Sequence, residues 1–282
     1  MTIKKKIVLI LLLVPLIVSI IYSAIPLQVR SPNFDDTHQV KFMTYNIHFS
    51  VGMDDRVDLE RILQNILIEN PDIIGLQEVE NGRITSQGVD AAFWLARALG
   101  MYHYYYPALN EHAFGVALLS RYPIINLSAW QLPTDVWERV LIRGTIQLNG
   151  SFWIDVFVTH LGLKEDNRTA QVEFILSRTS QVTRPMVLMG DFNLRDNTSE
   201  IATIVNVGGF NDTAKDYNNT NPGFTDTYPS WPFEPQKRID YIFATDFTSL
   251  INSKVINDTI PSVHAPWEYG SDHLPVVTTL QY

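Results

Sequence analysis

Polar residues that can do chemistry stand where short apolar runs of this chain end. One apolar run ends at His160, and the next ends just before Asp191. Apolar strands that repeatedly stop at such residues indicate that several strand ends converge on one polar pocket. The full set of these strand-end residues is Asn46, Gln77, Glu78, His160, Asp191, Asn193, Asp240, Asp272 and His273.

The residue types in this set favour phosphate chemistry with a hard metal ion. Carboxylate and amide oxygens are the ligands that Mg²⁺ or Mn²⁺ prefers. Two histidines beside carboxylates can donate to a phosphoryl group or carry protons. The chain has no cysteine, which excludes disulfides, a thiol nucleophile and thiolate-bound zinc. Each residue alone has a simpler explanation. A single Asp at a strand end is often a turn residue or a helix cap, and His160 could be a core histidine. The prediction therefore depends on the whole set.

The apolar patterns predict the elements that must position these residues. Residues 59–67 carry apolar side chains at helical spacing, and we expect Asp54 and Asp55 to cap that helix. Helices alternate with strands early in the chain and strands dominate later, which favours a mixed α/β domain with two packed sheets. Segment 222–235, rich in proline and aromatic residues, is expected to lie over a site. The expected strands are 40–45, 73–77, 116–119, 140–148, 152–159, 186–189, 239–243 and 276–280, and the further helices are 91–99 and 168–178.

Residues 1–27 differ from the rest of the chain. Lys4, Lys5 and Lys6 precede an apolar run of roughly the 20 residues that a membrane-spanning helix needs. Tyr22 is too large for the −3 position of a cleavage site after Ala24, so we expect an uncleaved signal-anchor, with a cleaved signal peptide as the alternative. Either reading places the rest of the chain outside the cytoplasm, membrane-anchored or secreted. Residues 28–38 are then a linker and 39–282 one domain, expected to be monomeric.

The charge balance bears on the partner. The chain has a net charge of −9, and without the three leader lysines 18 basic residues face 30 acidic ones, a net charge of −12. No basic run lies outside the leader. Strong non-specific binding to a nucleic-acid backbone is therefore not expected without help from metal ions.

The order of the motifs resembles a known superfamily. TYNIH, GLQEV, ALLSRYP, VTHL, GDFN, RIDYIF and SDHLPV occur between residues 41 and 280. This series resembles the endonuclease/exonuclease/phosphatase superfamily, which includes DNase I-like nucleases, neutral sphingomyelinases and inositol polyphosphate 5-phosphatases. The resemblance implies a DNase I-like α/β fold in four layers, α/β/β/α, in which helices flank a two-sheet sandwich. Residues 90–124 also resemble the calcofluor-white-hypersensitivity family, whose relatives act in the lipid remodelling of GPI anchors.

The resemblance also implies metal ligands and substrate contacts. Glu78 matches the principal ligand of a Mg²⁺ or Mn²⁺ ion, and Asn46 and Asp272 match positions that complete or assist its shell. The family often has an arginine before the strand that leads to the first histidine. Both Arg139 and Arg143 are candidates for that substrate contact, and strand alternation places them on one face.

The catalytic roles implied by the resemblance fall on five residues. Asp191 matches the residue that orients or deprotonates the attacking water, and Asn193 matches a donor to the phosphoryl oxygens. His273 matches the histidine that stabilises the pentacovalent phosphorus, and Asp240 matches its carboxylate partner. His160 matches the second histidine of the DNase I-like branch, an acid for the leaving oxygen.

These observations lead to one function and two alternatives. We expect a Mg²⁺-dependent phosphodiesterase that uses in-line attack of an activated water, acting on a membrane lipid head group or glycolipid. The leading alternative is a secreted or tethered DNase I-like nuclease. A non-enzymatic binding module is disfavoured, because every catalytic position holds a competent residue.

Overall fold

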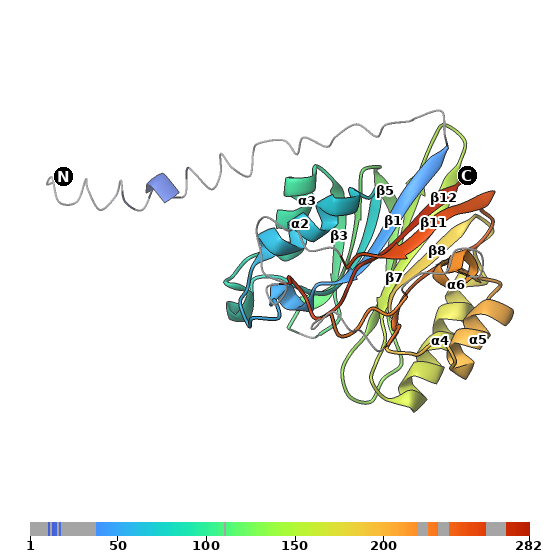
Figure 1. Cartoon of the computed structure of the whole chain (residues 1–282). Helices are drawn as coiled ribbons and strands as arrows, with labels where there is room; N and C mark the ends of the chain where they lie inside the picture. Colours follow the sequence, from blue (N-terminus) through green and yellow to red (C-terminus); the bar gives the residue numbers. More distant parts are fainter. Residues whose placement is uncertain are drawn as a thin grey trace, which may run out of the picture.

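Two six-stranded sheets face each other in the computed structural model, which describes residues 11, 13–15, 17, 38–109, 111–218, 225–230, 237–257 and 269–282 (Figure 1). The first sheet has the order β11 (Ser249–Val255), β12 (Val276–Gln281), β1 (Gln39–Asn46), β2 (Ile73–Glu80), β4 (Phe114–Ser120), β3 (Tyr102–Pro107). The second has the order β5 (Ile124–Gln131), β6 (Val140–Gln147), β7 (Trp153–His160), β8 (Met186–Asp191), β10 (Asp240–Ala244), β9 (Asn211–Asp212).

Both sheets are mixed. The β1–β2 and β7–β8 pairs are parallel, and the other pairs are antiparallel. Each parallel pair is joined through a helix, as parallel strands require. The expected mixed α/β domain with two packed sheets is confirmed.

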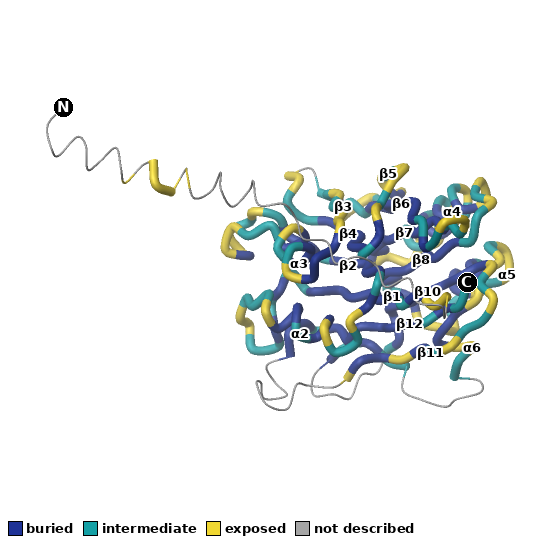
Figure 2. Tube along the Cα trace, turned by 90° about the horizontal axis from the view of Figure 1, so that it is seen from above, coloured by how far each residue is buried: buried dark blue, intermediate teal, exposed yellow. Residues whose placement is uncertain are grey.

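Helices cover the outer face of each sheet. Helices α2 (Leu59–Glu69) and α3 (Ala91–Leu99) pack on the first sheet, and α4 (Glu165–Thr179) and α5 (Ser199–Asn206) pack on the second (Figure 1). A third apolar core fills the space between the sheets. Figure 2 shows the buried central strands of both sheets, with exposed residues on helices and loops. The order of layers is therefore α/β/β/α.

Local sequence explains where the predicted helices begin and end. The side chain of Asp58 accepts hydrogen bonds from the backbone N–H groups of Glu60 and Arg61 and caps α2. The expectation that Asp54 and Asp55 cap this helix is wrong. Asp54 pairs with Arg61 at 2.8 Å instead, because it lies a full turn before the helix start.

The other predicted elements have bounds close to those expected, but several strands and two helices were not expected. The additional elements are β3, β5, β9, β11, α5 and α6 (Thr213–Asn218). In the part of the chain that the structure describes, no helix is long and apolar enough to cross a membrane. The proposed signal-anchor lies mostly outside the described residues, as do positions 222–224 and 231–235 of the proline-rich segment.

Candidate active site

Strand alternation brings four predicted residues to one end of the space between the sheets. Phe42 in β1, Val158 in β7, Met189 in β8 and Ile242 in β10 all face the core between the sheets. Successive side chains of a strand point to opposite faces, so positions an even number of residues away lie on the same side. Those positions at the strand ends are Asn46, His160, Asp191 and Asp240, and all four are buried.

A β-bulge places Glu78 beside them. Leu76 pairs with Ala117 and Val79 with Gly115, so Gln77 and Glu78 together stand opposite one residue of β4. Leu76 and Val79 both face the helix-side core. Both bulge residues can therefore occupy the inner side, and Glu78 reaches its position with a positive φ of 54°.

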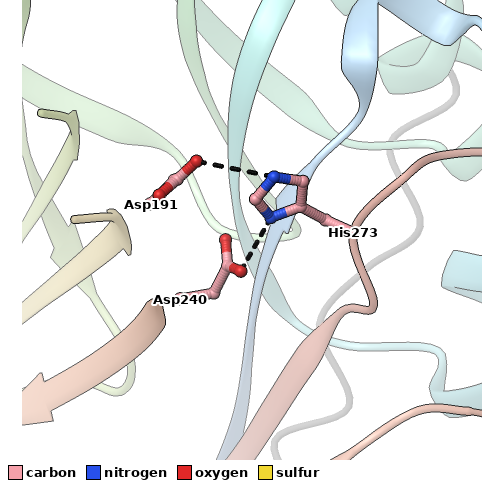
Figure 3. Close-up of side chains that lie close together, drawn as sticks. All are labelled: Asp191, Asp240 and His273. Carbon is pink, nitrogen blue, oxygen red and sulfur yellow. Dashed lines mark hydrogen bonds and ion pairs between the residues drawn. The ribbon is translucent and has the colours of Figure 1, made fainter. Parts of the chain in front are cut away.

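Three of the predicted catalytic residues lie together in an array, with His273 in contact with both carboxylates (Figure 3). Nδ1 of His273 donates to Oδ2 of Asp240 at 2.8 Å. Nε2 of the same ring lies 3.7 Å from Oδ2 of Asp191. Asp191 and Asp240 are also paired residues of the antiparallel strands β8 and β10. The imidazole is therefore held by two buried carboxylates, and Asp240 keeps a proton on its Nδ1.

The array has unusual protonation equilibria. Burial by itself lowers the pKa of His273, but the charges of Asp240 and Asp191 outweigh burial and raise that pKa to about 10. Burial, and then the charge of Asp240, raises the pKa of Asp191 to about 7. His273 is therefore positively charged at neutral pH, and Asp191 is poised to take up a proton.

Asn46 positions carboxylates in this arrangement. Its Nδ2 donates to Oδ2 of Asp191 at 3.0 Å and to Oε1 of Glu78 at 3.2 Å. Its Oδ1 already accepts from the backbone N–H of His48. The amide nitrogen of Asn46 therefore faces the two carboxylates, and its expected place in the metal shell stays a prediction.

His160 and Asn193 form a second pair beside Asp191. Nδ2 of Asn193 lies 3.2 Å from Nε2 of His160, and its backbone N–H donates to Oδ1 of Asp191. Burial, followed by the positive charges of Arg139 and His273, lowers the pKa of His160 well below its usual value. His160 is neutral at neutral pH, so its Nε2 can accept from Asn193.

A cavity of about 570 Å³ opens over this cluster. Arg139 lines it, and the guanidinium also donates to the carbonyl of Leu161. Arg143 does not line the cavity, because its guanidinium binds the buried carboxylate of Asp155 at 2.9 Å. Of the two arginine candidates, the structure brings only Arg139 to the cluster. Among the predicted residues, those that line the cavity are Glu78, Arg139, His160, Asp191, Asn193, Asp272 and His273.

The carboxylates of Glu78 and Asp272 could hold a hard divalent cation. Oδ1 of Asp272 is buried and has no hydrogen-bond partner among the described residues. Burial, and then the charge of Asp272, raises the pKa of Glu78 despite the hydrogen bond from Asn46. A cation would neutralise both carboxylates and would give Oδ1 of Asp272 the partner that it lacks.

A second group of possible metal ligands already uses ligand atoms in hydrogen bonds within the protein. Asp191, Asp240 and His273 also bring ligand atoms within 4.8 Å of one another. However, Nδ1 of His273 and Oδ2 of Asp240 bind each other, and Oδ2 of Asp240 also accepts from Thr227 at 2.6 Å. The oxygens of Glu78 and Asp272 therefore fit a cation better.

Sequence reasoning missed two residues of the proline-rich segment. The hydroxyl of Thr227 donates to Asp240, and the ring of Tyr228 lies 4.9 Å from the ring of His273. Tyr228 also lines the cavity. The expectation that this segment lies over a site is therefore correct for its described residues, and the Thr-Asp-Thr-Tyr run was the available signal.

Basic residues that are scattered in the sequence also converge here. Arg168, Arg195 and Lys237 line the same cavity as Arg139. They come from α4, from the loop after β8 and from the loop before β10. The sequence did not reveal this local positive charge, because it contains no basic run outside the leader. The fold gathers single basic residues from separate segments.

This geometry defines a class of protein: a hydrolase in which a charged histidine, flanked by two carboxylates, faces a cavity with acidic and basic walls. Comparison with known proteins supplies the family. The profile of the Endonuclease/Exonuclease/phosphatase family matches residues 43–273. The chain belongs to this family, whose members hydrolyse phosphate esters and depend on divalent metal ions.

One curated relative and many solved structures are similar to the chain. Protein cwh43 of Schizosaccharomyces pombe is 32% identical over 149 residues, which cover 52% of this chain but only 15% of that protein. The mannosyl-6-phosphatase Bt3783 of Bacteroides thetaiotaomicron matches with a TM-score of 0.71 and 19% identity, over 86% of this chain and 100% of the other. Truncated Caenorhabditis elegans TDP2 matches with a TM-score of 0.67 and 20% identity, over 88% and 100%. The two structures support the fold alone.

Proposed function

We propose that the chain is a Mg²⁺- or Mn²⁺-dependent phosphodiesterase that hydrolyses a membrane lipid or glycolipid by in-line attack of water. The observation that carries the proposal is the array of Asp191, His273 and Asp240 beside the carboxylates of Glu78 and Asp272 in one cavity. Hydrolysis of a phosphate ester needs an activated water and charge stabilisation at phosphorus, and this array supplies groups for both.

The pKa values of Asp191 and His273 suggest a role for each of them. Asp191, with a pKa of about 7, accepts a proton from the attacking water. His273 remains charged through its contact with Asp240 and stabilises the negative charge that develops on the phosphoryl oxygens. The Arg139 guanidinium on the cavity wall adds a second positive contact.

The leaving oxygen needs a proton as well. The lowered pKa of His160 makes this ring neutral before substrate binds. A phosphate group beside the ring brings negative charge, which raises its pKa. His160 can then take a proton from solvent at Nε2, which releases the hydrogen bond from Asn193, and pass it to the leaving oxygen. Nδ2 of Asn193 stays bonded to the carbonyl of Leu161.

A divalent cation fits the carboxylates of Glu78 and Asp272, assisted by Asn46. When bound, it neutralises charge on the non-bridging phosphoryl oxygens. The oxygen donors and the absence of cysteine from the chain favour Mg²⁺ or Mn²⁺ over soft metals.

Two exposed apolar side chains, one on the cavity wall and one on a loop tied to it, support a lipid substrate. Leu163, which lines the cavity, is 70% exposed, and Trp137 on the loop before β6 is 62% exposed. Lys164 binds Asp135 at 2.9 Å, which ties the two loops together. The similarity to cwh43 and the largely apolar run at residues 7–27 also support a lipid substrate. An anchored domain meets lipid head groups at high effective concentration.

The alternative is a nuclease, and one observation favours it. Arg139, Arg168, Arg195 and Lys237 line a single cavity, so the expected repulsion of a polyanion is offset locally. The lipid proposal stands first because the net charge of −9 opposes long-range attraction of nucleic acid.

The deciding experiment compares substrates on one preparation of the full-length protein in detergent with Mg²⁺. We expect a higher kcat/KM for lipid in mixed micelles than for duplex DNA, loss of activity with EDTA, and recovery with Mg²⁺ or Mn²⁺. Glu78→Ala should weaken metal binding and turnover together, whereas Glu60→Ala, on the outer helix α2, should change neither. Full activity in metal-free buffer contradicts the metal assignment. A preference of about tenfold for DNA, or 1.4 kcal/mol, that Glu78→Ala abolishes would establish the nuclease instead.

A further inference from the structure

The cavity extends well beyond the groups that act on the scissile phosphate. Its volume of about 570 Å³ is many times the roughly 30 Å³ share of one water molecule in the liquid. Away from the catalytic array, three basic side chains lie on its wall: Arg168, Arg195 and Lys237. We call these three residues the outer basic wall.

The outer basic wall forms no ion pair within 4.0 Å in the part of the chain that the structure describes, although the charge of Arg168 acts on Glu200 and that of Arg195 on Asp226 at longer range. Ion pairs within 4.0 Å there engage other basic side chains, such as Arg143 and Arg184 with Asp155, but none of these three. Acidic residues outnumber basic ones by nine in this chain, so partners are abundant. Three cations that form no such ion pair face one cavity. Their positive charge is therefore available to bind an anion.

Local contacts hold two of these cations in place. Lys237 and Tyr228 exchange two backbone hydrogen bonds of 3.0 and 3.1 Å, and Nζ of Lys237 lies 5.6 Å from the centre of the Tyr228 ring. The same ring lies against His273. The guanidinium of Arg168 donates to the carbonyl of Leu163. Lys237 of the outer basic wall is thus connected to His273 through one aromatic ring.

We propose that the outer basic wall is a second anion subsite, which binds a phosphate group carried by the substrate next to the scissile phosphate. Guanidinium groups match phosphate oxygens in pairs, and a lysine ammonium adds a point charge. The substrate then carries two phosphates a few bonds apart, as in a phosphorylated lipid head group or a terminally phosphorylated nucleotide. The proposal rests on the proposed phosphoesterase function and specifies its substrate class.

Binding tests the subsite without depending on turnover. The probes are alkane bisphosphonates of increasing chain length and the matching monophosphonates, which the enzyme cannot hydrolyse at the C–P bond. Titration calorimetry uses the full-length protein in detergent with Mg²⁺. We expect one chain length to bind at least about tenfold more tightly than its monophosphonate, the size expected for one added charge-assisted contact.

Variants then locate the preference. Arg195→Ala and Lys237→Ala should each remove most of the preference for the bisphosphonate while leaving the affinity for the monophosphonate unchanged. Lys215→Ala, which removes a basic residue outside this cavity, should leave the preference intact. Equal affinity for the two probes at every chain length overturns the subsite, as does a preference that survives in both wall variants.

Turnover of paired substrates distinguishes the source of the second phosphate. One pair is phosphatidylinositol and phosphatidylinositol phosphate in mixed micelles, and the other is dithymidylate with and without a terminal phosphate. Discrimination within the lipid pair that the wall variants remove supports both proposals. Discrimination within the nucleotide pair alone supports the subsite and contradicts the lipid function. Binding preference without turnover of any pair supports the subsite and contradicts the hydrolase proposal for these substrates.

Discussion

The charge of His273 depends most on one of its neighbouring carboxylates. Asp240 binds Nδ1 at 2.8 Å and is the largest source of the raised pKa, since burial alone acts in the opposite direction. Thr227 fixes Asp240 from the other side. The positive charge that we assign to catalysis is therefore conditional on Asp240 and not intrinsic to the histidine.

Asp240→Asn should lower the pKa of His273 from about 10, because it removes the largest of the charges that oppose burial. We expect turnover to fall by about 10²–10³-fold, the usual cost of removing one group that stabilises charge in the transition state. NMR titration of labelled histidine in metal-free protein measures the pKa. Asp226→Asn, a change in the same segment at a residue not bonded to His273, is the control. A pKa of His273 that stays near 10 in Asp240→Asn would remove Asp240 from this role.

The residues at the site were predictable to different degrees. Asn46, His160, Asp191 and Asp240 stand at strand ends on the inner face, so alternation alone places them together. Glu78 was also predicted from its place at a strand end, but the bulge breaks the alternation there, and only the family resemblance implied its role as a metal ligand. Thr227, Tyr228, Arg195 and Lys237 come from loops that have no periodic pattern, and Arg168 comes from α4. The proline-rich segment was expected over a site, but the sequence did not bring these individual residues to the cavity.

Among the elements, the four strands that sequence analysis did not predict are the four sheet edges, β3, β5, β9 and β11. Edge strands have a neighbour on one side only, and β3 and β5 expose many of their residues on both faces. Burial on one or both faces creates the apolar alternation that reveals a strand. Central strands such as β7 and β8 are buried almost throughout and were found for that reason.

The loop between β5 and β6 presents apolar side chains on a braced backbone. Asn167 of α4 donates to Asp135 at 2.6 Å, and Thr134 donates to the carbonyl of Trp137. Val136 and Trp137 are nevertheless 51% and 62% exposed. Polar contacts thus hold these side chains away from the core, in a position where they could contact a bilayer interface.

Val136→Ser with Trp137→Ser should reduce turnover of lipid in vesicles by about tenfold or more, since burying one such side chain contributes about 1.5–3 kcal/mol. Turnover of a soluble aryl phosphodiester should not change, because neither residue lines the cavity. Val207→Ser is the matched control, a residue 77% exposed just after α5. An equal loss on both substrates would indicate damage to the site and would argue against an interfacial role.

The molecule as a whole combines an acidic net charge with a partly basic cavity. A net charge of −9 favours solubility and slows the approach of polyanions, while the four cavity cations act only at short range. A substrate that is already concentrated near the protein suits this combination. The leader provides that proximity in our proposal.

We expect the full-length protein to fractionate with membranes and to expose residues 39–282 on the side opposite Lys4, Lys5 and Lys6. Protease added to the outer side of intact cells should digest the domain, and the leader should stay in the membrane fraction. An intact cytoplasmic enzyme serves as the control for leakage. A soluble mature form that begins near Ala24 or Ile25 would show a cleaved signal peptide, and protection of the domain inside the cell would contradict both topologies.

The bulge in β2 makes activity depend on how many residues the strand contains as well as on which ones. Deleting Gln77 would let Glu78 pair opposite β4 in its place, with Leu76 and Val79 still facing the helices. The carboxylate would then retreat by about 3.3 Å, one residue's rise, towards Thr44 and away from Asp272. The apolar pattern of both sheets would survive. An insertion or deletion at this one point is therefore a short evolutionary route between a hydrolase and an inactive protein with the same fold.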